Sequence, residues 1–284
     1  MKIFQIKSLY FFMLLLLNSI ICFSQSGMEL VTKMLAKEKE INTLKFDMTI
    51  KERVNGKLVV SKSSFKIQYT PFKVYLKQEY PMKGMEALYV TGTNNNNVLV
   101  NPNSFPWTNL NFDVNSYHMR KDQHHSIYDA GIKYVYSIIT HLMDKYKDEI
   151  ENLISNEGTI VWKNKQCWKI TMKNPHFEYI KHKISENENP HKIAEKYKIN
   201  DYYIIDKNAG INKFEDCKLG MTVKIPNDYA TKMDIWLDKE TFLPVIMKIY
   251  DDLGVYEEYE FINMKVNLKF DTKEFTQDYK DYNF

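Results

Sequence analysis

Alternating apolar and polar residues predict β-strands along most of this chain. The alternation is regular at 45–50, 64–69 and 73–78. Further strands are predicted at 88–90, 98–100, 159–162, 167–172, 232–237, 244–250 and 255–261. Asn55-Gly56 predicts a tight hairpin between the first two strands, and the asparagine run 94–97 predicts another turn. The strands are therefore expected to pair antiparallel with their neighbours.

Two segments carry apolar residues at helical spacing instead. In 27–40, the residues Met28, Val31, Met34 and Leu35 fall on one side. The segment 126–154 repeats apolar residues every three or four positions and predicts one long helix. The order of helix, strands, long helix and strands predicts an α+β fold. A curved antiparallel β-sheet, a half-barrel, would pack on helices at its concave face.

A small unit with different local signals lies at 182–226. Asn189 can cap a helix whose first residue is Pro190, and Asn200 or Asp201 can cap a second short helix. The segment 221–225 alternates as a strand and ends at a proline. These signals predict a strand–helix–helix–strand module inserted in the larger domain.

This stretch resembles a LysM domain, a βααβ module. The resemblance rests on His182, Ile184, Ile193-Ala194, Tyr197, Ile199, Ile204-Ile205, Asn208, Gly220, Val223, Ile225 and Pro226. It implies binding of peptidoglycan, an N-acetylglucosamine glycan, in a groove between two loops. The glycan-binding residues would be Asn187, Glu188, Asn189, Pro190, Ala209, Gly210, Ile211 and Asn212. Asn187–Pro190 replaces the usual Gly-Asp-Thr-Leu loop, so a structural or protein-contact insert is the alternative.

The larger part resembles the outer-membrane lipoprotein carrier superfamily, the LolA/LolB-like fold, and a bacterial family of unknown function near it. The segment 236–267 carries the likeness through Asp238, Leu243-Pro244, Gly254 and Phe261, as does the strand at 71–77. The likeness implies an apolar cavity for a lipid or lipoprotein. The candidate lining is Phe46, Met48, Phe65, Ile67, Val74, Leu76, Met82, Met85, Ile138 and Leu142. The alternative is that these residues form an ordinary core.

The N-terminus predicts export to the periplasm. Lys2 and Lys7 precede the mostly apolar run 9–23, which is short for a membrane span, and small residues favour cleavage after Ser24. Lipidation at Cys22 is the alternative. The predicted divisions are a signal peptide at 1–24, a LolA-like domain at 25–176 and 228–284, and the LysM insert at 177–227. The mature chain has no further apolar run long enough for a transmembrane segment.

Charge and reactive residues exclude several functions. Loss of Lys2 and Lys7 lowers the formal charge from +3 to +1, and no basic stripe predicts nucleic-acid binding. His118, His124 and His125 are expected to be solvated, so neither a metal nor another cofactor is predicted. The carboxylate pairs 251–252 and 257–258 are expected in a turn and on an exposed strand face. Cys167 and Cys217 are expected to be free, with one disulfide as the alternative.

The sequence therefore predicts a non-enzymatic, exported cell-envelope binding protein, and its resemblance to LysM implies association with the wall. Its partners would be peptidoglycan and a lipid, a lipoprotein or another envelope component. The alternatives are a wall-modifying hydrolase with an unrecognised site and a purely structural envelope protein.

Overall fold

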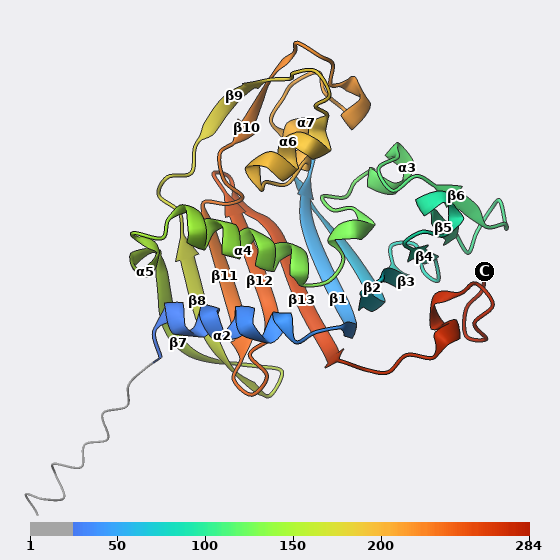
Figure 1. Ribbon diagram of the computed structural model, residues 1–284, viewed down its shortest axis with the longest axis horizontal. Coiled ribbons are helices and arrows are strands. Elements are labelled where there is room, and N and C mark those ends of the chain that lie inside the picture. The colour runs from blue at the N-terminus through green and yellow to red at the C-terminus, as the bar shows by residue number, and fades with distance from the viewer. Residues whose placement is uncertain (1–24) are drawn as a thin grey trace, which may run out of the picture.

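The computed structural model describes residues 25–284. The predicted signal peptide, its cleavage site and Cys22 lie outside the described residues. Within the described part, no helix is both long and apolar enough to cross a membrane. The chain forms a curved, unclosed antiparallel sheet with helices on one face and a small module at one end (Figure 1).

Eleven strands form the main sheet, in the order β6-β5-β4-β3-β2-β1-β13-β12-β11-β8-β7. Their bounds are β1 Thr43–Val54, β2 Lys57–Tyr69, β3 Phe72–Tyr80, β4 Glu86–Val90, β5 Val98–Asn101, β6 Leu110–Phe112, β7 Ile154–Trp162, β8 Lys165–Lys173, β11 Lys232–Asp238, β12 Pro244–Asp251 and β13 Gly254–Val266. The predicted strands and both predicted turns are confirmed. The late strand β13 pairs with β1 at the centre, so residues after the insert complete the sheet begun before it.

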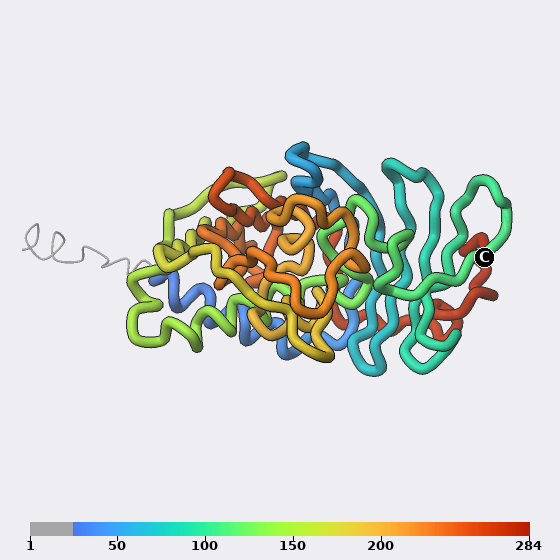
Figure 2. The backbone as a smooth tube through the Cα atoms, turned by 90° about the horizontal axis from the view of Figure 1, so that it is seen from above, coloured from blue at the N-terminus to red at the C-terminus, as the bar shows by residue number. Residues whose placement is uncertain are grey.

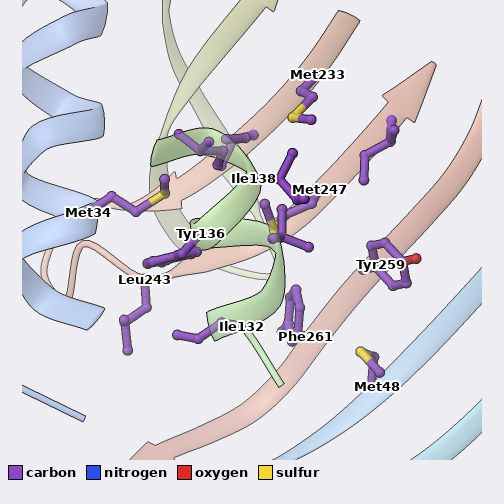
Figure 3. Packing of buried hydrophobic residues seen from close by; sticks show 14 of the residues in the cluster. Met34, Met48, Ile132, Tyr136, Ile138, Met233, Leu243, Met247, Tyr259 and Phe261 are labelled. Carbon is purple, nitrogen blue, oxygen red and sulfur yellow. The ribbon is translucent and has the colours of Figure 1, made fainter. Parts of the chain in front are cut away.

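Two helices cover part of the concave face. Helix α2, Gly27–Lys39, is the predicted first helix, and the Ser26 hydroxyl caps it by accepting a hydrogen bond from the backbone N–H of Glu29. Helix α4, Lys133–Lys145, crosses the same strands beside it (Figure 1). Ile138 of α4 packs near Met233 and Met247 of the sheet, and Phe261 lies near Ile132 (Figure 3).

The prediction of one helix over 126–154 is wrong. The segment contains a 3-10 turn, η2 Ile127–Asp129, followed by α4 and by a short helix, α5 Ile150–Leu153. Gly131 has a φ of +94°, and a Cβ at this position would collide with the Tyr69 hydroxyl. The backbone therefore leaves helical geometry at Gly131 although the apolar spacing continues across it.

The inserted module has the predicted order of elements. It comprises β9 Tyr179–Lys183, α6 Pro190–Tyr197, α7 Tyr202–Asp206, a 3-10 turn η3 Phe214–Asp216 and β10 Thr222–Pro226. Its two strands pair only with each other, and its apolar side chains form a separate small core. The Asn189 side chain caps α6 as predicted, because its oxygen accepts from the Lys192 N–H at 2.9 Å.

The remaining short elements are η1 Asn94–Asn96, α3 Tyr117–Arg120 and η4 Thr272–Phe275. Residues after β13 run back across the far part of the sheet. There Tyr282 stacks on Tyr75 with ring centroids 3.7 Å apart, and Phe275 packs with Leu88 in a cluster separate from the main core. No pattern in the sequence predicted this docking of the C-terminal segment.

Candidate functional site

An apolar cavity of about 480 Å³ lies between the concave face of the sheet and the segment 118–135. The sheet side is formed by β1, β2, β3, β13 and the turn after β3. The residues on this side are Met48, Ile50, Glu52, Val59, Ser61, Phe65, Leu76, Gln78, Pro81, Met82, Tyr259 and Phe261. Helices α2 and α4 cover the strands at the β7 end of the sheet, whereas here the cover is a loop and a 3-10 turn, which leaves a space unfilled.

The covering segment gives the cavity a polar side. Met119, Ile127, Tyr134 and Val135 contribute apolar surface, whereas Ser126 and Asp129 contribute hydrogen-bonding groups. Asp129 accepts a hydrogen bond from the Ser126 N–H at 2.9 Å. His118, Gln123 and His125 add further polar atoms. The cavity can therefore hold an amphiphile, with its apolar part against the sheet and its polar part at this segment.

Four of the ten residues proposed for the cavity lie in its wall. They are Met48, Phe65, Leu76 and Met82. The other six lie elsewhere: Phe46, Ile67, Val74, Ile138 and Leu142 are buried in the main core, and Met85 packs against it. Only the first turn of α4 reaches the cavity, so Tyr134 and Val135 line it in place of the two later helix residues.

A buried charged cluster centred on Glu257 lies behind the polar side. Glu257 is on β13 and is fully buried. Its Oε1 lies 2.8 Å from His124 Nδ1 and 3.3 Å from His125 Nε2. The same oxygen accepts from the Asn200 amide at 3.1 Å, and Oε2 accepts from the Tyr229 hydroxyl at 2.9 Å. Because Asn200 belongs to the insert, this cluster joins the insert to the sheet.

Electrostatics keep Glu257 ionised. Burial alone would raise its pKa, but the charge of His125 and hydrogen bonds from His124 and His125 hold the pKa well below its usual range. Burial likewise opposes the charge on His125, and the Glu257 carboxylate outweighs it and raises the pKa of His125 well above its usual value. The two residues therefore form an ion pair at neutral pH.

The expectation that the histidines and carboxylate pairs are solvated is wrong for three residues. His124 is buried with Glu257, and Asp251 is buried between Arg53 and Lys207. Strand alternation places Glu257 and Glu258 on opposite faces, but it does not show which face the insert covers. Within residues 25–284, no group of His, Cys, Asp and Glu could hold a metal ion.

A second, more open hollow of about 680 Å³ lies between the insert and the half-barrel. The insert contributes Tyr202, Phe214 and the loop 205–213, and the half-barrel contributes the β1–β2 turn and α3. Arg120 of α3 binds Asp201 of the insert at 2.7 Å, which fixes the two sides. Aromatic rings and polar groups thus face one another across this interdomain cleft.

The two loops proposed for glycan binding differ in their surroundings. Ala209, Gly210, Ile211 and Asn212 line the interdomain cleft. The other loop, Asn187, Glu188, Asn189 and Pro190, does not line this cleft. Three of its residues stabilise the fold of the insert. The Glu188 carboxylate binds His182 and the Ser185 N–H, Asn189 caps α6, and Pro190 is buried.

Both described cysteines are free. Cys167 is buried in β8 and Cys217 is half-buried in the insert, and burial raises the pKa of each thiol. This agrees with the expectation of free thiols.

Solved structures similar to this chain come from several bacteria. LppX, a lipoprotein of Mycobacterium tuberculosis, is 12% identical, with 86% of this chain and 98% of LppX covered at a TM-score of 0.41. A LolA superfamily protein from Nitrosomonas europaea is 8% identical over 90% of this chain and 99% of its own, at 0.31. MucB of Pseudomonas aeruginosa, solved with MucA, is 9% identical, with 88% of this chain and 60% of the other chain covered at a TM-score of 0.38. At these TM-scores the likeness supports no inference about function.

The family comparison is more specific. No curated protein matches the chain. A family described as a protein of unknown function, DUF1571, matches residues 41–183, from the turn before β1 to the end of β9. The match spans just over half of the 284 residues, so the chain belongs to the DUF1571 family.

Proposed function

We propose that this protein is an exported, non-enzymatic binding protein of the cell envelope, and that its half-barrel holds the acyl chain of a lipid or a lipoprotein. The apolar cavity is the observation that carries the proposal. Small-molecule sites are concave, mostly apolar spaces of a few hundred Å³ with a few polar groups, and this cavity has that size and that lining.

The cavity volume limits the ligand to about one acyl chain. Its roughly 480 Å³ would take about 16 methylene-sized groups at about 30 Å³ each, the share of liquid volume of one water molecule. Two chains would need about twice that volume. The ligand therefore has a single chain in the cavity, with its polar group at Ser126 and Asp129.

Ser61 offers a direct test, because its small side chain faces the cavity from β2. In Ser61→Trp the indole would occupy the space of the chain, whereas Ser61→Ala removes only a hydroxyl. A fluorescent fatty acid should bind wild type and Ser61→Ala equally and Ser61→Trp at least about tenfold more weakly. Equal binding by both folded variants would contradict the proposal.

The hydrolase alternative has less support. The carboxylate pair at 257–258 cannot supply a free base, because both oxygens of Glu257 are occupied by His124, Asn200 and Tyr229 in a buried site. Glu258 is paired with Lys51 and Lys248. General acid–base chemistry needs a carboxyl group that a substrate can reach.

A second candidate function is peptidoglycan binding by the insert, as its likeness to LysM implies. The observation that favours it is the interdomain cleft, where the loop 209–212 faces Tyr117 and Phe214. Aromatic rings beside amide groups suit a sugar. Tyr117→Ala should abolish co-sedimentation with purified peptidoglycan. Tyr128→Ala is the matched control, because Tyr128 is equally exposed (46% against 44%) and lies outside the cleft. Equal pelleting of both variants would contradict a glycan site in this cleft.

A further inference from the structure

Three hairpin turns lie in a row at one end of the strands. Strands β1 to β6 are consecutive antiparallel neighbours, so every second connection falls at the same end of the strands. These connections are the turn 55–56, the turn 81–85 and the loop 102–109, and they line one long side of the molecule (Figure 2). Asn103 of the third donates to the Lys83 carbonyl of the second at 3.1 Å, so these two turns touch.

Large apolar side chains project from all three turns and their flanks. We call this surface the apolar rim; it consists of Leu58, Val59, Tyr80, Met82, Phe105 and Trp107. Phe105 is 84% exposed and Trp107 is 76% exposed, so neither packs against the protein. Such clustering at loop tips marks an interaction surface, because single exposed apolar residues are common but groups of them are not.

The charge on the rim favours an anionic partner. The segments 55–62, 80–85 and 102–109 contain Lys57, Lys62 and Lys83 and no acidic residue. All three lysines are exposed, and none forms an ion pair among residues 25–284. The nearest acid in the sequence is Glu79, just before the second segment. Aromatic residues flanked by lysines are the composition that inserts at the interface of a bilayer with acidic lipids.

The rim is continuous with the mouth of the apolar cavity. Val59 and Met82 belong to both, and Pro81, next to Met82 in the chain, also lines the cavity. We infer that the apolar rim docks on the surface of a lipid bilayer that contains anionic lipids, with the cavity mouth facing the membrane. Docking itself needs only the rim, whereas passage of an acyl chain between bilayer and cavity rests on the proposed function.

Vesicle flotation of the mature chain tests this inference. With vesicles of phosphatidylcholine and phosphatidylglycerol, the double variant Phe105→Ser/Trp107→Ser should bind at least about tenfold more weakly than wild type. Val161→Ser is the matched control, because Val161 is 60% exposed and lies near the β7–β8 turn, at the opposite end of the strands from the rim. Thermal unfolding should be the same in all three proteins.

Substitution of the three rim lysines gives an independent test of the same inference. Lys57→Gln/Lys62→Gln/Lys83→Gln should weaken binding to vesicles with phosphatidylglycerol and leave binding to pure phosphatidylcholine unchanged. Failure of wild type to float with either vesicle, or equal flotation of the Phe105/Trp107 variant, would overturn the inference. Because that variant keeps Ser61 and the cavity wall, it should still bind the fluorescent fatty acid in solution. A failure of docking is thereby distinguished from a failure of the cavity.

Discussion

Glu257 illustrates how far single residues can be predicted. Alternation along β13 separates Glu257 from Glu258, but the same pattern fits an exposed pair. Glu257 becomes buried because Asn200 and Tyr229, which are 57 and 28 positions away in the chain, cover it and supply donors. Adjacent histidines before a helix signal solvent exposure, and only the insert overrides that signal for His124. Tertiary contacts of this kind leave no local trace in the sequence.

Substitution of Glu257 should therefore be far more damaging than substitution of its neighbour. Glu257→Gln leaves the mostly buried His125 charge without its nearest carboxylate and removes the buried acceptor of His124, and we expect the free energy of unfolding to fall by about 3 kcal/mol. Glu258→Gln is the control, because its lysine partners are partly exposed, and it should cost less than about 1 kcal/mol. Urea denaturation at neutral pH measures both values, and equal losses would contradict the cluster.

His125 makes part of the stability depend on pH. Its pKa is raised in the folded state, so the folded protein holds the proton more tightly than the unfolded chain does. The stabilisation is fully present below the unfolded pKa of about 6.5 and is lost as pH rises through the folded pKa. The difference in unfolding free energy between wild type and His125→Gln should shrink above about pH 6.5. A constant or growing difference measured across that range would count against the ion pair.

At the scale of elements, the sequence predicts the type and position of helices and strands well, but it predicts breaks within a helical segment poorly. Helix α2 and the strands follow from periodicity, and the order of the insert follows from the Asn189 cap and the alternation of its last strand. The first hairpin follows from the Asn55-Gly56 turn. The break at Gly131 was missed because the apolar spacing of the segment continues through it. This break also creates the candidate site, since a continuous helix would cover the sheet where the loop now leaves the cavity.

Substitution of Gly131, in the segment 118–135 that covers the cavity, should lower the stability of the protein strongly. In Gly131→Ala the methyl group meets both an unfavourable φ and the Tyr69 hydroxyl, and we expect a loss of about 2 kcal/mol or more. Gly158 is a matched control, because its φ is also +94° and nothing lies near its missing Cβ. Gly158→Ala should therefore cost only about 1 kcal/mol. Thermal unfolding that ranks the two variants in the opposite order would argue against the packing at Gly131.

At the scale of the whole molecule, the sequence indicated a half-barrel with a βααβ insert but not how they meet. The insert closes over one end of the sheet, where Tyr203 stacks on Tyr256 with ring centroids 4.3 Å apart. Arg120 of the half-barrel forms an ion pair with Asp201 of the insert, and Glu257 of the half-barrel accepts a hydrogen bond from Asn200 of the insert. The C-terminal segment covers Tyr75 and Leu88. These contacts depend on complementary surfaces far apart in the chain, which periodicity cannot reveal.

Deletion of the insert should consequently weaken the rest of the molecule. A chain lacking 177–227 leaves Arg120 without its carboxylate and uncovers Tyr256 and Glu257, so we expect a lower unfolding temperature than for the intact protein. An independent module would leave that temperature unchanged. Differential scanning calorimetry separates the two cases.

The central claim is that the cavity holds one acyl chain, and native mass spectrometry tests it most directly. The delipidated mature protein would be offered equal amounts of a lysophospholipid and the matching diacyl phospholipid. The account predicts one added lysophospholipid mass on wild type and on Ser61→Ala, and none on Ser61→Trp. The absence of any lipid adduct on wild type, or the same adduct on Ser61→Trp, would contradict it.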